Sequence, residues 1–374
     1  MLQNNANKNV LIDASLLISE ACCLSGAYVY IGYPITPTNL IYKYSFQRFP
    51  LSLAAPDEIT TLQWMAGFSA AGKFPVTASS FPGLALMIES INMAFMMELP
   101  LLIILSQRLG PSTGSATTGA QGDLLLLRGL ISGGYSIPVL CPSNFEDCWL
   151  LTNRSIKTAM ELRTPVVLLT SKEMIMTQRN FNLSTLSAIA PISNNLYESN
   201  ETYLPYKAEN NQPPDFLPLG NDMHQVRLNA STHDESGLIR KTTPNAMRNT
   251  KRLHDKIVNR ISEYTYYKYY HQDKSNKLIV TYGITSDAAR DAVQILKSTG
   301  KNISLLIVNT LIPVPSKIKE IINSYSKIIF AEENLTGLFI ELLYGHQIPQ
   351  NVRGVNKLGK MITPHDIIAI ANSF

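Results

Sequence analysis

Two short runs of apolar and β-branched residues constrain the fold of this 374-residue chain more than any other sequence feature. Residues 75–79 and 101–106 have the length of a β-strand and show no alternation between apolar and polar positions. Such strands are typical of a parallel sheet that helices cover on both faces. Residues 84–98 lie between the two runs and have the length and apolar content of a connecting helix. The sequence therefore predicts an α/β fold.

Helical and strand-like segments alternate over most of the chain. The alternation covers residues 10–169 and returns at residue 277, and Gly or Pro stands at most of the junctions. Between these parts Asn, Pro, Ser, Tyr and charged residues replace the apolar runs, and only residues 245–270 are predicted to form a helix. We therefore expect an α/β domain at 1–180, an extended connecting segment at 181–275 and a smaller α/β domain at 276–374.

Composition and charge argue against several classes of function. Hydrophobic residues make up 45% of the chain and charged residues 16%, which indicates a globular protein. Because the net charge is only +4 and no five like charges follow one another, we expect neither nucleic acid nor a membrane as partner. Glu89, Glu98 and Pro100 interrupt the longest apolar stretch, so no transmembrane helix is expected. Residues 1–10 lack the pattern of a secretory signal, which predicts a cytoplasmic location.

Short motifs for the common cofactors are absent from this sequence. The four cysteines include no C-x-x-C pair, so they are not expected to ligate an iron–sulfur cluster by themselves. The six histidines show no metal-ligand spacing, and we expect no metal ligand on this chain. Dinucleotide, P-loop, zincin and α/β-hydrolase signatures are also missing. These enzyme classes therefore lose their strongest support.

Polar residues and glycines gather instead at the predicted carboxyl ends of the first-domain strands, where open α/β sheets bind ligands. Taken alone, each group has a structural explanation: the prolines form turns, and Glu58 is an acid in the first turn of a helix, where the helix dipole favours it. The groups lie at residues 33–38, 57–58, 79–83, 107–114 and 121–123.

In this order the groups resemble the α subunit of the 2-oxoacid:ferredoxin oxidoreductases, which binds the pyrimidine part of thiamine diphosphate in that family. The resemblance extends to E-N-L-T-G near the C-terminus and covers nearly the whole chain. G-Y-P-I-T-P together with Q-R-x-G-P-S-T-G is hard to obtain by chance. The matching segments are G-Y-P-I-T-P at 32–37, D-E-I at 57–59, T-A-S-S-F-P-G at 77–83, Q-R-L-G-P-S-T-G at 107–114 and Q-G-D-L at 121–124.

The resemblance implies a fold, a reaction and partners. The implied fold is a pyrimidine-type thiamine-diphosphate-binding domain with a parallel sheet, followed by a transketolase C-terminal-like α/β domain. The implied reaction is the oxidative decarboxylation of a 2-oxoacid to an acyl-CoA and CO₂, with electrons passed to ferredoxin or flavodoxin. Thiamine diphosphate would be shared with a β subunit that carries Mg and a 4Fe–4S cluster. A heterodimer or heterotetramer is therefore expected.

The resemblance also implies roles for individual residues. Glu58 matches the family's acid, which hydrogen-bonds N1′ of the aminopyrimidine and so promotes removal of the C2 proton. Arg108 and Thr36 match the residues that hold the 2-oxoacid carboxylate, for which arginine offers a bidentate fork that lysine lacks. The wall of the cofactor site is expected to include Tyr33, Pro34 and Ile35.

Four positions depart from the family pattern. Phe81 and Leu109 stand where the family has glycine, Ala116 replaces a proline, and Tyr135 replaces a common histidine. Glycine at such turns usually permits a positive φ or a close approach of another chain, so we expect a reshaped pocket or subunit contact. Two alternatives stay open: a catalytically drifted assembly or regulatory subunit, and a subunit of a non-oxidative thiamine-dependent enzyme.

Overall fold

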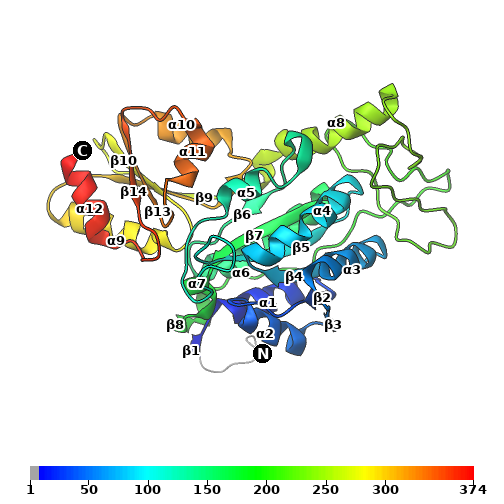
Figure 1. Ribbon diagram of the computed structural model, residues 1–374, viewed down its shortest axis with the longest axis horizontal. Coiled ribbons are helices and arrows are strands. Elements are labelled where there is room, and N and C mark those ends of the chain that lie inside the picture. Colours follow the sequence, from blue (N-terminus) through cyan, green and yellow to red (C-terminus); the bar gives the residue numbers. More distant parts are fainter. Residues whose placement is uncertain (1–7) are drawn as a thin grey trace.

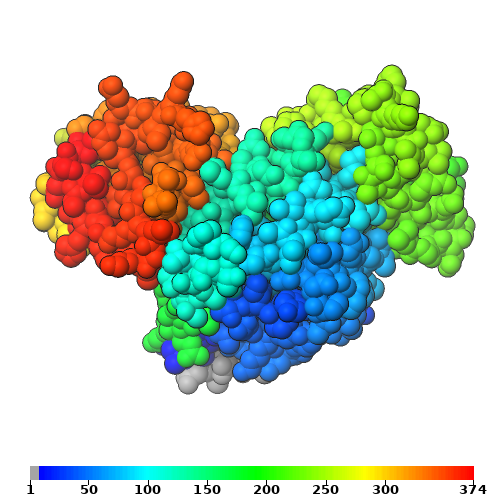
Figure 2. All heavy atoms as spheres, viewed as in Figure 1, coloured from blue at the N-terminus to red at the C-terminus, as the bar shows by residue number. Residues whose placement is uncertain are grey.

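Three β-sheets organise the computed structural model, which describes residues 8–374. The two large sheets lie side by side, and the connecting segment with its long helix extends from the opposite side of the first sheet (Figure 1). In the space-filling view the C-terminal part and the connecting segment are two bulges that flank the N-terminal part (Figure 2). The expectation about a secretory signal concerns residues 1–10, of which 1–7 lie outside the described residues.

The first sheet has seven strands in the order β12-β6-β7-β5-β4-β2-β3. All neighbouring pairs are parallel except β12 and β6, which confirms the predicted α/β class and parallel sheet. Its strands are β2 (Val29–Gly32), β3 (Leu51–Ala54), β4 (Pro75–Ser79), β5 (Leu101–Gln107), β6 (Val139–Leu140), β7 (Pro165–Ser171) and β12 (Thr310–Ile312). A separate two-stranded sheet pairs β1 (Asn9–Ile12) with β8 (Arg179–Asn182).

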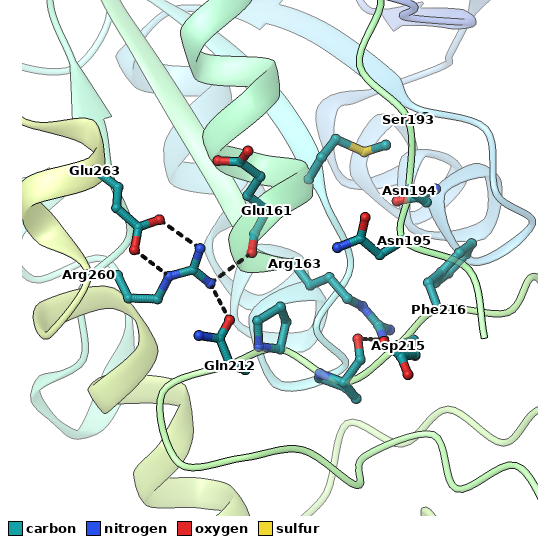
Figure 3. A pocket seen from close by; sticks show the side chains of 13 residues that line it. Glu161, Arg163, Ser193, Asn194, Asn195, Gln212, Asp215, Phe216, Arg260 and Glu263 are labelled. Carbon is teal, nitrogen blue, oxygen red and sulfur yellow. Dashed lines mark hydrogen bonds and ion pairs between the residues drawn. The ribbon is translucent and has the colours of Figure 1, made fainter. Parts of the chain in front are cut away.

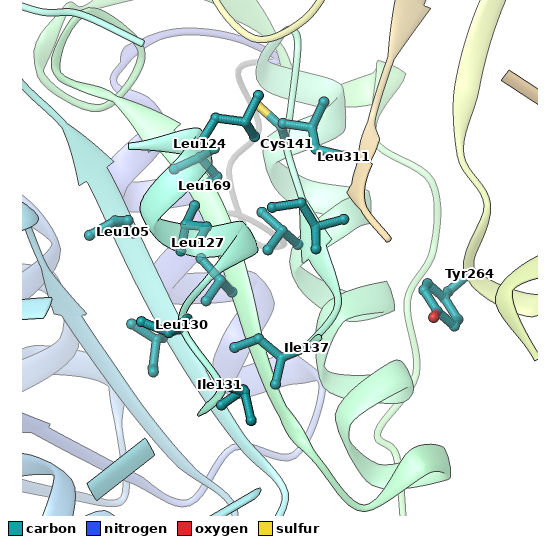
Figure 4. Packing of buried hydrophobic residues seen from close by; sticks show 14 of the residues in the cluster. Leu105, Leu124, Leu127, Leu130, Ile131, Ile137, Cys141, Leu169, Tyr264 and Leu311 are labelled. Atoms are coloured by element: carbon teal, nitrogen blue, oxygen red, sulfur yellow. The ribbon is translucent and has the colours of Figure 1, made fainter. Parts of the chain in front are cut away.

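Successive residues of the central strands face two different cores, as the period of two in a strand requires. In β5, Ile103 and Leu105 pack into one core, whereas Leu102 packs into the other. Figure 4 shows Leu105 beside the leucines of the short helix that covers this face. Each fully buried leucine stabilises the fold by about 1.5–3 kcal/mol. The first core is covered by α3 (Glu58–Ala70), α4 (Phe81–Met96) and α5 (Leu124–Arg128), and the second by α1 (Ala14–Leu24), α2 (Asn39–Arg48), α6 (Phe145–Leu162) and α7 (Lys172–Met176).

The second sheet has five strands in the order β14-β13-β10-β11-β9, of which only β9 is antiparallel to its neighbour. The first core continues from the first sheet into this one, so both sheets share a single apolar cluster. The strands are β9 (Tyr267–Tyr270), β10 (Lys277–Thr281), β11 (Ser304–Val308), β13 (Lys327–Glu332) and β14 (Val352–Asn356). The helices are α9 (Thr285–Ser298), α10 (Ser316–Asn323), α11 (Leu338–Tyr344) and α12 (Pro364–Ser373).

The helix predicted over residues 245–270 is wrong in its second half. The helix α8 covers Pro244–Val258, and a 3-10 turn at Ile261–Tyr264 separates it from the edge strand β9. The reason is the aromatic run at 264–270, because tyrosine favours strands and packs well on a half-buried sheet surface. Further 3-10 turns occur at Ser132–Gly134 and Leu183–Thr185. Among residues 8–374, no helix combines the length and apolar character that crossing a membrane requires.

Candidate active site at the carboxyl end of the first sheet

The loop between β2 and α2 carries four of the predicted site residues. Tyr33 and Pro34 are exposed, whereas Ile35 and Thr36 are half-buried. Thr38 closes the loop, because its N–H and its hydroxyl both donate to Ile35 O, at 2.9 and 2.8 Å. The loop therefore offers two side chains to the outside and keeps Thr36 close to the sheet.

Glu58 is the first residue of α3 and lies above the same end of the sheet. Asp57 caps the helix: its Oδ1 accepts a hydrogen bond from Thr60 N–H at 2.6 Å. The Glu58 side chain is only 7% exposed. It has no hydrogen-bond or ion-pair partner among residues 8–374, and its carboxylate oxygens are not among the atoms that are fully shielded from solvent. The Glu58 carboxylate is therefore available to bind a group that residues 8–374 do not supply.

Gly83, in the first turn of α4, makes room for that carboxylate. A Cβ atom at Gly83 would lie 2.7 Å from Glu58 Oε1 and 2.1 Å from Ser79 Oγ, closer than side chains tolerate. The φ of Gly83 is not positive, so the glycine is required here for close approach rather than for its backbone conformation. The acid from α3 thus rests against the backbone of α4 at the carboxyl end of β4.

Arg108 and Thr36 come together across the end of the sheet. Arg108 follows β5, is 6% exposed, and donates from Nη1 to the Thr36 carbonyl oxygen at 2.6 Å. Its Nε is buried and has no partner within the part of the chain that the structure describes. The Thr36 hydroxyl accepts a hydrogen bond of 3.3 Å from Asn39 Nδ2. The hydrogen bond from Nη1 thereby orients the guanidinium, and its other nitrogens are left to donate to another acceptor.

Asp123 is a second buried acid near Arg108. Its N–H donates to Gln107 Oε1 at 3.4 Å, which closes the base of the long loop after β5. Its Oδ2 is buried and makes no hydrogen bond to residues 8–374. Burial raises the pKa of Asp123 to about 7, and the nearby Arg108 charge opposes that shift. Burial lowers the pKa of Arg108, and Asp123 opposes it in turn.

The replaced glycines do not strain the backbone. Phe81 is the first residue of α4 and Leu109 forms a β-bridge with Ser115, and neither has a positive φ. A positive φ is therefore not required at either position, and the expected reshaping of the pocket or of the subunit contact stays a prediction. The Leu109 side chain instead reaches the C-terminal domain. A Cβ atom added at Gly359 would lie 3.4 Å from Leu109 Cδ2.

A hollow of about 340 Å³ lies elsewhere, between the end of α6 and the connecting segment (Figure 3). None of the predicted site residues lines it. Its arginines are already engaged: Arg260 binds Glu263 at 2.7 Å, and Arg163 donates to the carbonyl oxygen of Asp215 at 3.0 Å. The Arg163 contact attaches the connecting segment to the first domain, as does a hydrogen bond of 3.2 Å from Arg260 Nη1 to the Glu161 carbonyl oxygen. Across residues 8–374, no group of three His, Cys, Asp or Glu side chains is arranged to hold a metal ion.

Sequence reasoning missed the roles of Ser79, Gly83 and Gln121. The first two occur in the glycine-containing turn that the sequence singles out, but only the packing shows that the side chains of Ser79 and Glu58 both lie against Gly83. Gln121 occurs in the Q-G-D-L segment, yet its side chain binds residues more than 160 positions later. No local sequence signal could have indicated that contact.

Two family models match the chain. The model described as pyruvate flavodoxin/ferredoxin oxidoreductase, thiamine diphosphate-binding, matches residues 20–252, and the model for pyruvate:ferredoxin oxidoreductase core domain II matches residues 275–367. The subunit KorA of 2-oxoglutarate synthase from Methanothermobacter marburgensis is 30% identical over 324 residues, which cover 85% of this chain and 86% of that protein. The ketoisovalerate oxidoreductase subunit VorB from Methanothermobacter thermautotrophicus is 28% identical over 96% of both chains.

Solved structures share the fold. The 2-oxoglutarate:ferredoxin oxidoreductase from Magnetococcus marinus superposes with a TM-score of 0.90 at 24% identity, over 98% of this chain and 65% of that chain. A split-gene transketolase in an inactive β4 tetramer gives a TM-score of 0.53 at 14% identity, over 97% of both chains. The order of motifs, the parallel sheet and the family matches agree, and the chain belongs to the α subunits of the 2-oxoacid:ferredoxin oxidoreductase family.

Proposed function

We propose that this chain is the α subunit of an enzyme that oxidatively decarboxylates a 2-oxoacid to an acyl-CoA and CO₂ and passes the electrons to ferredoxin or flavodoxin. The names of the relatives support a 2-oxoacid substrate, since they include 2-oxoglutarate synthase and ketoisovalerate oxidoreductase subunits. The observation that carries the proposal is Glu58, a residue only 7% exposed, whose carboxylate lies against Gly83 without a partner among residues 8–374.

Glu58 fits the aminopyrimidine end of thiamine diphosphate. A carboxylate without a partner can accept a hydrogen bond from a protonated ring nitrogen, and the missing Cβ at Gly83 leaves it the room to do so. Thiamine diphosphate, when bound, supplies the carbon nucleophile that attacks the 2-oxoacid and accepts the electron pair released with CO₂. Glu58 holds the proton at N1′ and thereby favours removal of the C2 proton. The exposed Tyr33 and Pro34, with Ile35, form the wall beside it.

Arg108 and Thr36 fit the carboxylate of the 2-oxoacid. Arg108 uses Nη1 for the Thr36 carbonyl, which fixes the plane of the guanidinium. The remaining nitrogens can then donate to a carboxylate in the forked geometry that arginine provides. The Thr36 hydroxyl, which accepts from Asn39, keeps its own proton available for the same carboxylate.

The proposal includes a β subunit that holds the diphosphate, Mg and a 4Fe–4S cluster. The cysteines of this chain support that division, because burial raises the pKa of Cys22, Cys141 and Cys148 and so disfavours the thiolates that bind iron. The functional unit would be a heterodimer or heterotetramer in the cytoplasm that binds CoA and ferredoxin or flavodoxin.

The test is co-expression with the β subunit and a measurement of CoA-dependent ferredoxin reduction by 2-oxoglutarate and branched 2-oxoacids. We expect Glu58→Gln to lower kcat at least about 100-fold, since general acid–base groups contribute about 10²–10⁴. Glu89→Gln, which changes an exposed acid of α4 in the same way, should leave activity unchanged. A wild-type complex that binds thiamine diphosphate without turnover would indicate a drifted subunit. Turnover without electron transfer would indicate a non-oxidative enzyme.

A further inference from the structure

Gln121 connects the first domain to the C-terminal domain. Its side chain is 1% exposed and binds three groups of that domain. Nε2 donates to the Tyr282 carbonyl oxygen at 2.9 Å, and Oε1 accepts from Glu333 N–H at 2.7 Å and from the Thr285 hydroxyl at 2.9 Å. One amide therefore joins the end of β10, the start of α9 and the residue after β13.

The backbone of Gln121 adds two further contacts to the same domain. Its N–H donates to the Glu333 carbonyl oxygen at 2.7 Å, and its carbonyl oxygen accepts from Asn334 Nδ2 at 3.2 Å. Gly283 leaves just enough space for the Gln121 side chain, because a Cβ atom at Gly283 would lie only 3.0 Å from Gln121 Nε2. Buried networks of this kind hold one arrangement, because a donor or acceptor that loses its partner is costly.

This anchor lies on the loop that carries the substrate-binding arginine of the proposed function. The loop leaves the sheet at Arg108 and returns at Asp123, two residues beyond Gln121. Asp123 N–H binds Gln107 Oε1, next to Arg108, so the two ends of the loop meet. Glu173 binds the returning end as well, since its Oε1 accepts from Gly119 N–H at 3.0 Å. A shift of the loop at Gln121 would therefore move the surroundings of Arg108.

We propose that Gln121 is a positioning residue through which the C-terminal domain fixes the Arg108 loop for binding of the 2-oxoacid carboxylate. This inference rests on the proposed function, because it requires Arg108 to hold that carboxylate. Glu58 lies on α3 and rests against Gly83 of α4, whereas the hydrogen bonds of Gln121 within residues 8–374 reach neither helix.

The experiment compares Gln121→Glu and Thr285→Val with wild type in the assembled complex. Gln121→Glu removes the donor to the Tyr282 carbonyl, and Thr285→Val removes one donor to Gln121 Oε1. We expect the KM for the 2-oxoacid to rise about tenfold or more in Gln121→Glu, as for a weakened hydrogen bond to a charged group. We expect kcat and the Kd of thiamine diphosphate to stay within about threefold of wild type. Thr285→Ser, which keeps the hydroxyl, should restore the wild-type KM.

Hydrogen exchange of the amides at 109–119 gives a readout that does not depend on turnover. We expect faster exchange there in Gln121→Glu and Thr285→Val, with unchanged exchange in α3. Unchanged KM and loop exchange, or an equal loss of kcat and thiamine diphosphate binding, would overturn the inference. If Gln121→Glu does not assemble, Thr285→Val decides by the same criteria. A wild-type complex that does not oxidise any 2-oxoacid would instead refute the proposed function.

Discussion

Replacement of Gly83 by alanine tests the packing of Glu58 directly. The new Cβ would lie 2.1 Å from Ser79 Oγ and 2.7 Å from Glu58 Oε1, so at least one of these side chains must move. Ser79 lies on β4 between buried neighbours and has little freedom, whereas Glu58 is held by no hydrogen bond to residues 8–374. The substitution is therefore expected to displace the carboxylate.

The expected changes in kcat and in the free energy of unfolding distinguish an effect of Gly83→Ala on the site from an effect on folding. Alanine is favoured over glycine in a helix by about 1 kcal/mol, while overpacking a core costs about 1–3 kcal/mol. The net change in the free energy of unfolding should thus be a loss of no more than about 2 kcal/mol. Loss of a correctly placed acid should lower kcat about 10²–10⁴-fold. Activity should therefore fall far more than stability.

The assay measures 2-oxoacid oxidation and thermal unfolding of the complex for Gly83→Ala and for a matched control, Gly67→Ala. Gly67 lies in α3, has no positive φ, and a Cβ there would meet no atom within 4 Å. The control should keep full activity and gain up to about 1 kcal/mol in stability. Full activity of Gly83→Ala would refute the argument that Glu58 must occupy this place.

Three other predictions concern charged groups. Arg108→Lys should raise the KM for the 2-oxoacid about tenfold or more in steady-state assays, because lysine lacks the fork; an unchanged KM would contradict the role. Arg252→Met should cost about 3–5 kcal/mol in chemical denaturation, since it leaves the fully buried Glu98 with one cation fewer; a near-neutral change would contradict this. Burial raises the pKa of Asp123 to about 7, so this carboxyl binds more protons in the folded than in the unfolded protein. The free energy of unfolding should therefore fall as pH rises from about 4 to 7. The melting temperature of Asp123→Asn relative to wild type should accordingly rise over that range and not fall.

The central strands of the fold could be predicted because their signal is local. Residues 101–106 are apolar at almost every position, and burial on both faces requires that pattern. The edge strand β3 gives no such signal, since its four residues are half-buried or exposed. The strand β9 follows α8 closely, and its pairing with β11 decides its conformation in place of the helical pattern before it.

The site could be predicted in its residues but not in its contacts. Motif order places Glu58, Thr36 and Arg108 at strand ends, and the structure brings Arg108 to the Thr36 carbonyl. The contact of Glu58 with Gly83 depends on how α3 packs on α4. The contacts of Gln121 depend on the docking of two sheets that are distant in sequence. Such tertiary relations carry no periodicity that a single sequence could reveal. The roles of these residues in catalysis remain predictions.

The most direct test of the account measures exchange of the C2 proton of thiamine diphosphate with deuterium in the assembled complex, followed by NMR after rapid quenching. The account places Glu58 at the aminopyrimidine, so Glu58→Gln should slow this exchange about 100-fold or more while the cofactor remains bound. Glu89→Gln should exchange at the wild-type rate. Wild-type exchange in Glu58→Gln, with the cofactor bound, would contradict the account.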